Sequence, residues 1–249
     1  MPDPSLETFA PVDLKDALVL AAFPTTGQAA SIAGQYLIRN LGLPLVGHVR
    51  VPELSSITAI QEGRATSAVR IHGGEVACKL DKSCPRIFVV TTELAPSPQA
   101  GLRLSEAILD WAAAGNAHLV LALEGVVRSE GDDTPDIFCA AGDKGVLAEL
   151  RKTGIPAIER ALIGGMTAHL LLLAPARKVR SGAILVEASR DHPDGRAAAA
   201  LLAGIAKIVP DVEMDPKPLL DEAMALEEEL RRMRETAEPR VGPSPSQFI

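Results

Sequence analysis

Residues 17–23 form a continuous apolar run, and the turn-forming residues 24–27 (Pro-Thr-Thr-Gly) follow it at once. A run that is apolar throughout, rather than alternating, is typical of a strand buried on both faces of a sheet. Behind the turn, apolar residues recur at helical spacing as far as Leu37, and residues 45–51 are strand-like again. The order strand, turn, helix, strand predicts an α/β fold with a parallel sheet.

The rest of the chain continues this alternation. Strands are predicted at residues 86–92, 118–123, 136–141 and 183–187, and helices at 99–114, 142–152, 164–173 and behind the capping residue Asp194. Residues 52–82 differ, because short β-type runs alternate there with turn signals such as Gly73-Gly74. We expect this stretch to form hairpins at one edge of the sheet.

Charge and composition limit the classes of partner. The formal net charge is -7, and no Lys/Arg cluster lies outside the C-terminal helix, so nucleic acid is not an expected partner. The three cysteines lack CxxC spacing and a paired histidine, so no metal site is expected, and Cys139 is interpreted as a small core residue. With no signal pattern and no apolar run of membrane-spanning length, we expect a cytoplasmic protein.

Beyond Pro216 the apolar period changes to alternating spacings of four and three. The seam consists of Leu219, Ala223, Leu226, Leu230 and Met233. This pattern predicts an amphipathic helix over residues 215–237 with about two and a half heptads. The seam either packs on its own domain or joins another subunit. In the second case Leu219, Leu226, Leu230 and Met233 are the candidate oligomer contacts.

Residues 238–249 are expected to form a flexible tail, because three prolines, a glycine and two serines cannot build a helix or a central strand. The tail nevertheless ends in Phe248 and Ile249. Apolar residues gain nothing in water, so this arrangement suggests an arm that docks onto a larger partner. The alternative is a frayed terminus whose last residues have no role.

Two carboxylates are candidates for chemistry. Glu93 and Glu124 directly follow predicted buried strands, and ligands of α/β proteins gather at the carboxyl ends of strands. Such a pair could serve as acid and base. His192 lies in the polar sequence Asp-His-Pro-Asp, where it is either part of a proton-transfer pair or part of a capped turn before a helix.

Two helix starts are rich in glycine. The turn at residues 24–28 could hold a phosphate, but it lacks the known phosphate-binding motifs, so a structural turn is preferred. Gly164-Gly165-Met166-Thr167 is interpreted as close backbone packing, with a ligand site as the alternative. His169, in the apolar helix that follows, is interpreted as a core histidine.

Several stretches match a known family in order and spacing. They are residues 23–27, 31–37, 41–48, 105–111, 163–168, 192–194 and 219–223. Over about residues 10–235 the chain resembles the PAC2 family, the proteasome assembly chaperone 2 group, in its single-chain archaeal-type branch. Glu124-Gly125 departs from the Gly-Gly that many members have at that place.

The resemblance implies a three-layer α/β/α sandwich with a mostly parallel central sheet, similar to nucleoside phosphorylases but without their catalytic set. It also implies homo-oligomers, no cofactor, and for some members binding to the 20S proteasome. Those partners insert a C-terminal hydrophobic-Tyr-any residue motif between α-ring subunits. Here Phe248 matches the aromatic position, Ile249 supplies the carboxylate, and Gln247 departs from the hydrophobic position.

The expected organisation is an α/β core at residues 10–214, an amphipathic helix at 215–237 and a tail at 238–249. We expect a homo-oligomeric proteasome chaperone or adaptor that docks on the 20S α-ring through its tails. One alternative is an enzyme acting on a small molecule through Glu93, Glu124 and His192. Another is a purely structural oligomer held by the terminal helix.

Overall fold

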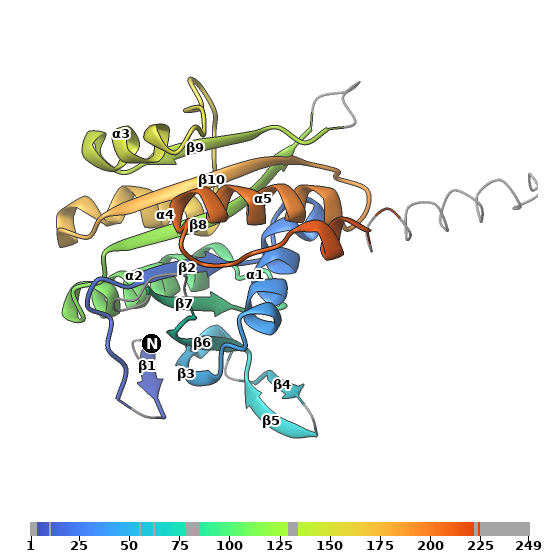
Figure 1. Cartoon of the computed structure of the whole chain (residues 1–249). Coiled ribbons are helices and arrows are strands. Elements are labelled where there is room, and N and C mark those ends of the chain that lie inside the picture. Colours follow the sequence, from blue (N-terminus) through green and yellow to red (C-terminus); the bar gives the residue numbers. More distant parts are fainter. Residues whose placement is uncertain are drawn as a thin grey trace, which may run out of the picture.

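The computed structural model describes residues 4–9, 11–54, 56–61, 63–77, 85–128, 134–221 and 224. Its centre is an eight-stranded sheet in the order β1-β3-β6-β7-β2-β8-β10-β9, and β4 and β5 pair separately (Figure 1). The strands are β1 Ser5–Thr8, β2 Leu18–Ala22, β3 Leu45–Arg50, β4 Thr58–Gln61, β5 Arg64–Ser67, β6 Val69–Glu75, β7 Arg86–Thr91, β8 Leu119–Val127, β9 Ile137–Ala141 and β10 Ser181–Ala188.

Parallel pairing is confined to the middle of the sheet. β7, β2, β8 and β10 are mutually parallel, whereas the pairings β1–β3, β3–β6, β6–β7 and β10–β9 are antiparallel. The central strand β2 is buried along its whole length, as its uninterrupted apolar sequence predicts. The predicted α/β class with a mostly parallel centre is confirmed.

Helices cover both faces, which gives the three layers. They are α1 Ala29–Asn40, α2 Pro98–Ala114, α3 Lys144–Lys152, α4 Gly165–Leu173 and α5 Gly195–Ile208. Apolar residues of α1, α3 and α5 form one core with Leu18, Leu20 and Ala22 of β2. Those of α2 and α4 form a second core with Val19 and Ala21, because successive side chains of a strand point to opposite faces.

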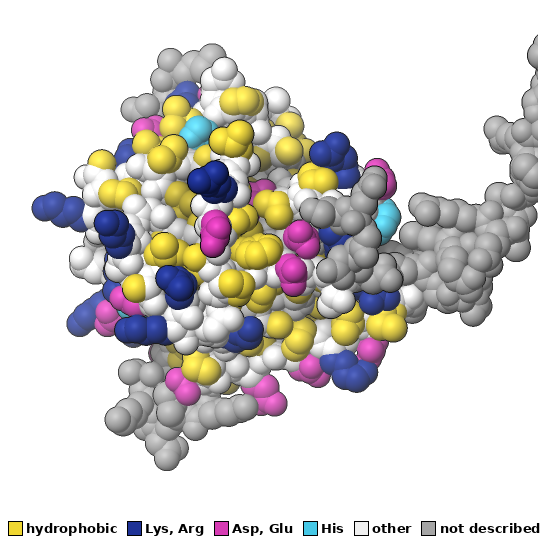
Figure 2. Space-filling model, turned by 90° about the horizontal axis from the view of Figure 1, so that it is seen from above, with side chains coloured by type: hydrophobic (Ala, Val, Ile, Leu, Met, Phe, Trp, Pro, Cys, Tyr) yellow, Lys and Arg dark blue, Asp and Glu magenta, His cyan; other side chains and the backbone are white. Residues whose placement is uncertain are grey.

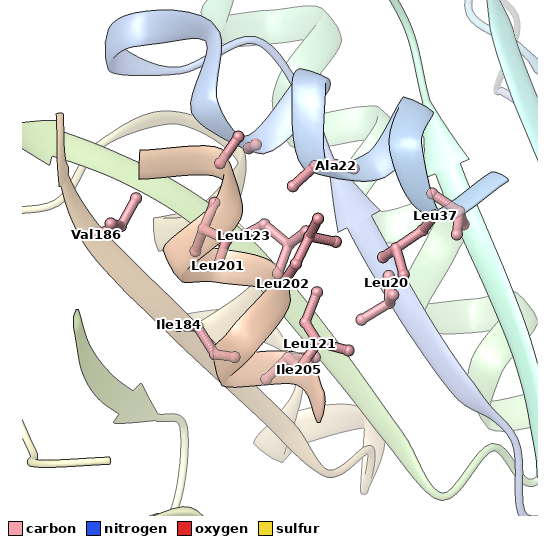
Figure 3. Close-up of a cluster of buried hydrophobic side chains, with 14 of the residues drawn as sticks. Leu20, Ala22, Leu37, Leu121, Leu123, Ile184, Val186, Leu201, Leu202 and Ile205 are labelled. Atoms are coloured by element: carbon pink, nitrogen blue, oxygen red, sulfur yellow. The ribbon is translucent and has the colours of Figure 1, made fainter. Parts of the chain in front are cut away.

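The first core contains fully buried side chains of both α5 and the parallel strands. Leu121 and Leu123 of β8 meet Leu201, Leu202 and Ile205 of α5 (Figure 3), and none of these five side chains is more than 1% exposed. Burial of each such side chain contributes roughly 1.5–3 kcal/mol, so this contact fixes α5 against the sheet.

Polar side chains cap the N-termini of three of these helices. Asp194 accepts a hydrogen bond from the Ala197 amide at 2.9 Å and so caps α5, as predicted. Ser97 caps α2 through the amide of Ala100, and Asp143 caps α3 through those of Gly145 and Val146. By contrast, α1 and α4 begin without a side-chain cap, and the N-cap residue of α4 is Gly164.

Several strands differ from expectation. β3 and β9, which were expected to belong to a parallel sheet, pair antiparallel with their neighbours. β6 runs straight through Gly73-Gly74, where a turn was predicted. The ring of Phe88 on β7 lies over Gly73, and an added Cβ there would stand 2.3 Å from Phe88 Cδ1. Glycine is needed at position 73 because β7 lies too close for a larger side chain, and not because the chain turns there. β8 continues through Glu124 to Val127 instead of ending at Leu123, and the edge strand β1 was not predicted. β4 and β5 form a hairpin, as expected for this stretch, but it is a separate two-stranded sheet and not an edge of the large one.

Among the described helices, none combines the length and the apolar character needed to cross a membrane. Residues 217–221 are helical and mark the start of the predicted C-terminal helix. This start is packed on its own protomer, since Leu219 is 5% exposed within the first core and Tyr36 donates a hydrogen bond to the carbonyl of Asp215 at 2.9 Å.

Candidate functional site

A cleft of about 550 Å³ lies at the carboxyl edge of the parallel strands. Its walls come from the end of β2, the middle of β8, the loop between β7 and α2, and the first turns of α2 and α4. The apolar lining residues include Phe23, Pro96, Leu123, Met166 and Leu170. The carboxyl edge is where α/β proteins bind ligands, and this volume is in the range of small-molecule sites.

Glu124 is the carboxyl group of the cleft. Its side chain is half-buried in β8, and Thr167 of α4 donates a hydrogen bond to its Oε2 at 2.6 Å. Burial raises the pKa of Glu124 to about 7, and the hydrogen bond from Thr167 opposes part of that rise. Near neutral pH this carboxyl group can therefore gain or lose a proton.

The start of α4 places Thr167. Gly165 has φ +63°, a backbone conformation that favours glycine, and it allows the chain to turn into the helix just before Met166 and Thr167. An added Cβ at Gly164 or Gly165 would meet nothing within 4 Å. The prediction of close backbone packing at this pair is therefore wrong, and both glycines line the cleft instead.

Glu93 does not join Glu124. It follows β7 as predicted, but its side chain is 58% exposed and forms an ion pair with Arg70 of β6, which is fully buried. Arg70 also donates to the carbonyl of Ser67 at 3.3 Å. Glu93 is not among the residues that line the cleft, so the two carboxylates do not form the acid–base pair considered for them.

His192 also lies apart from the cleft. Its Nδ1 is 3.1 Å from the carbonyl oxygen of the adjacent Pro193. The neighbouring Asp194 is 2% exposed and caps α5. The Asp-His-Pro-Asp sequence is therefore a capped turn, which was one of the two interpretations.

His169 is not the core histidine that the apolar sequence around it suggested. It is partly exposed and lines the cleft. The helix α4 is apolar on all sides, with Leu172 78% exposed, so its periodicity does not mark an inward face. The periodicity of the sequence therefore could not indicate whether His169 faces the core or the surface.

The turn at residues 24–28 makes structural contacts with β8, in keeping with the interpretation preferred over a phosphate site. Thr25 Oγ1 accepts a hydrogen bond from the Gly125 amide at 3.0 Å. An added Cβ at Gly125 would lie 2.2 Å from the carbonyl oxygen of Thr26, so the turn packs directly on β8.

Cys139 is fully buried, as predicted, and burial raises the pKa of its thiol.

The C-terminal candidates lie mostly outside the described residues. These are Leu226, Leu230, Met233, Gln247, Phe248 and Ile249. Leu219 is described, and it is buried in the core of its own protomer rather than offered to another subunit. For this position the intramolecular alternative is correct, because Leu219 belongs to the same apolar core as α1 and α5.

The outer surface carries both signs of charge. Figure 2 shows Lys and Arg side chains interspersed with Asp and Glu, and hydrophobic side chains between them, on the described part of one face. A wider hollow of about 1350 Å³ lies beside β3 and β5 and includes Arg39, Arg50 and Arg64. Unlike the carboxyl-edge cleft, it is an open, charged groove in which Arg50 already pairs with Glu7 at 3.3 Å.

Comparison with known proteins gives relatives over nearly the whole chain. The crystal structure of PbaA from Pyrococcus furiosus, described as an archaeal homolog of proteasome-assembly chaperone, is 27% identical, with a TM-score of 0.81 and coverage of 92% of both chains. PbaB of the same organism, described as an archaeal proteasome activator, has a TM-score of 0.81 at 18% identity, covering 94% of this chain and 100% of its own.

An uncharacterized protein of Methanocaldococcus jannaschii is 24% identical over 226 residues, which cover 91% of this chain and 89% of that protein. The model of the PAC2 family matches residues 19–234, from the central strand β2 into the C-terminal helix region. This match spans both cores, the carboxyl-edge cleft and the capped start of α5, and the chain therefore belongs to the PAC2 family.

Proposed function

We propose that this protein is a proteasome assembly chaperone or proteasome-binding adaptor that acts as a homo-oligomer and docks on the 20S α-ring through its C-terminal tails. The observation that carries the proposal is the likeness to PbaA, at 27% identity over 92% of both chains, within the PAC2 family. PbaA is described as a homolog of proteasome-assembly chaperone, and a likeness of this extent covers the scaffold rather than one motif.

The α/β body serves as a scaffold in this proposal. The alternative acid–base set loses its support, because Glu93 pairs with Arg70 and His192 contacts Pro193, whereas Glu124 lines the cleft. Leu219 and the hydrogen bond between Tyr36 and Asp215 fix the start of the C-terminal helix to the first core. In the proposal, the predicted helix over residues 215–237 connects this anchored start to the tail.

Docking would be multivalent. Several tails on one oligomer raise the effective concentration at a symmetric ring, so weak single contacts add up to firm binding. Each tail would contribute the aromatic ring of Phe248 as an anchor in a pocket and a carboxylate at Ile249 for a basic partner. Gln247 would contribute less, because an amide gains little from an apolar pocket.

The test removes residues 247–249 and measures co-sedimentation with purified 20S particles. We expect the apparent affinity to fall by at least about tenfold, and by a similar amount for Phe248→Ala. The matched control is Ser244→Ala with Ser246→Ala, which changes the same tail but keeps its tip and should leave binding unchanged.

Light scattering on each variant shows whether the assembly state is intact, which separates loss of the docking residues 247–249 from loss of the oligomer. Undiminished binding after deletion of residues 247–249 rejects tail docking. Failure of the intact chain to bind 20S particles at all rejects the adaptor function itself.

A further inference from the structure

Among the described residues, no ion pair is formed by Glu124, the carboxyl group of the cleft. Thr167 is its hydrogen-bond partner at 2.6 Å, through Oε2. Among the described residues that line the cleft, there is no Lys and no Arg. Two charged pairs follow the ends of neighbouring strands, Glu93 with Arg70 and Asp194 with Arg128, and neither pair lines the cleft. A half-buried carboxylate in this setting lacks the compensation that buried charges ordinarily have.

The cleft around Glu124 suits an apolar body of small size. Phe23, Pro24 and Pro96 contribute to its walls from the sheet side and the β7–α2 loop, and Met166 and Leu170 contribute from α4. A hollow of about 550 Å³ accommodates a molecule the size of a substituted ring. Mostly apolar walls with a small number of directional polar groups are the usual composition of a small-molecule site.

We propose that this cleft binds a small organic cation, an amine or amidine carried on an apolar group, with its charged head paired to Glu124. Thr167 keeps Oε2 engaged and fixes the plane of the carboxylate, and Oε1 accepts from the ligand. The apolar part of the ligand contacts the walls at Phe23 and Met166. The site uses none of the C-terminal residues, so it is independent of the proposed docking on the proteasome.

The charge of the site sets its selectivity. An anion is repelled by the ionised carboxylate, and a neutral isostere of the amine forgoes the ion pair. The raised pKa of Glu124 means that a bound cation must draw the proton off, so binding strengthens as the pH rises through about 7. His169 is the other titratable group among the described residues of the lining.

Benzylamine is a suitable probe, with benzyl alcohol as its neutral isostere, and calorimetry or NMR titration of the full chain measures binding. At about pH 8 we expect benzylamine to bind the wild type and to bind Glu124→Gln at least about tenfold more weakly. Benzyl alcohol should bind weakly and equally to both. The amide introduced by Glu124→Gln keeps an oxygen for Thr167, so this variant removes the charge and little else.

Glu159→Gln is the matched control, since Glu159 is an exposed residue outside the cleft and its loss changes the net charge by the same amount. It should bind benzylamine as the wild type does. Lowering the pH to about 5.5 should weaken benzylamine binding at least about tenfold in the wild type and in His169→Ala, because Glu124 itself is then protonated. The proposal is overturned if the wild type binds benzylamine and benzyl alcohol equally, or if Glu124→Gln binds benzylamine as tightly as the wild type does. It is also overturned if the wild type does not bind benzylamine at millimolar concentration.

Discussion

The guanidinium of Arg128 and the carboxylate of Asp194 form an ion pair 3.0 Å long at the junction of β8 and α5. The side chain of Asp194 is 3% exposed, and that of Arg128 is 19% exposed. The same carboxylate accepts hydrogen bonds from the amides of Ser189 and Ala197, each at 2.9 Å. One acidic side chain therefore ties together the end of β8, the end of β10 and the start of α5.

Asp194→Ala should lower the free energy of unfolding by about 2–4 kcal/mol, because it removes the cap of α5 and leaves Arg128 without its carboxylate. Asp143→Ala is the control, since Asp143 caps α3 without an ion pair, and it should cost about 1 kcal/mol. Urea unfolding of the two variants measures both. Equal losses would show that the Arg128 contact adds nothing to the cap.

Gly125→Ala should destabilise the protein by at least about 2 kcal/mol, because the new Cβ would stand 2.2 Å from the Thr26 carbonyl oxygen and must displace backbone. Gly101→Ala should instead stabilise it by about 0.5–1 kcal/mol. Gly101 lies inside α2, and an added Cβ there meets Met166 Sδ at 3.5 Å, an ordinary contact. Thermal unfolding of the pair compares the same chemical change in two places, and a loss at both would contradict this account.

Glu93→Gln should cost more stability than Arg70→Met. The first change leaves a fully buried guanidinium without its anion, whereas the second removes the buried charge and keeps an apolar side chain in its space. Because Glu93 is 58% exposed, water offsets part of the penalty, and we expect a loss of about 1–2 kcal/mol for Glu93→Gln. Denaturant midpoints at low and high salt test the ranking, which the reverse order would refute.

Glu124 should make the protein less stable as the pH rises. The pKa of Glu124 is raised to about 7 in the folded chain, against about 4.3 in an unfolded one, so the protonated form favours folding. Its contribution is fully present below about pH 4.3 and is lost as the pH rises through about 7, a change of at most roughly 4 kcal/mol. Unfolding free energies of the wild type and Glu124→Gln across this range isolate the effect, since the amide side chain of the variant does not titrate. A constant difference between the two proteins would show that the pKa is not raised.

The sequence by itself determined the layers and their order. An apolar run such as residues 17–23, bounded by the turn at residues 24–27, favours a strand buried on both faces, and the helical period behind it favours an α/β fold. The cap at Asp194 was equally readable, because capping depends on residues within one turn of the helix. The order of short stretches along the chain was enough to indicate the PAC2 family.

The tertiary structure alone decided which polar groups meet. Glu93 and Glu124 have the same local signal, a carboxylate at the end of a buried strand, yet one turns to Arg70 and the other to Thr167. Those partners lie 23 and 43 residues away along the chain, and the pairing of strands and the packing of α4 bring them close. His169 was misread for the same reason, since a helix that is apolar on every side does not indicate which side faces the cleft. Local sequence sets backbone conformation, whereas the meeting of distant side chains depends on register and packing, which no short window of residues contains.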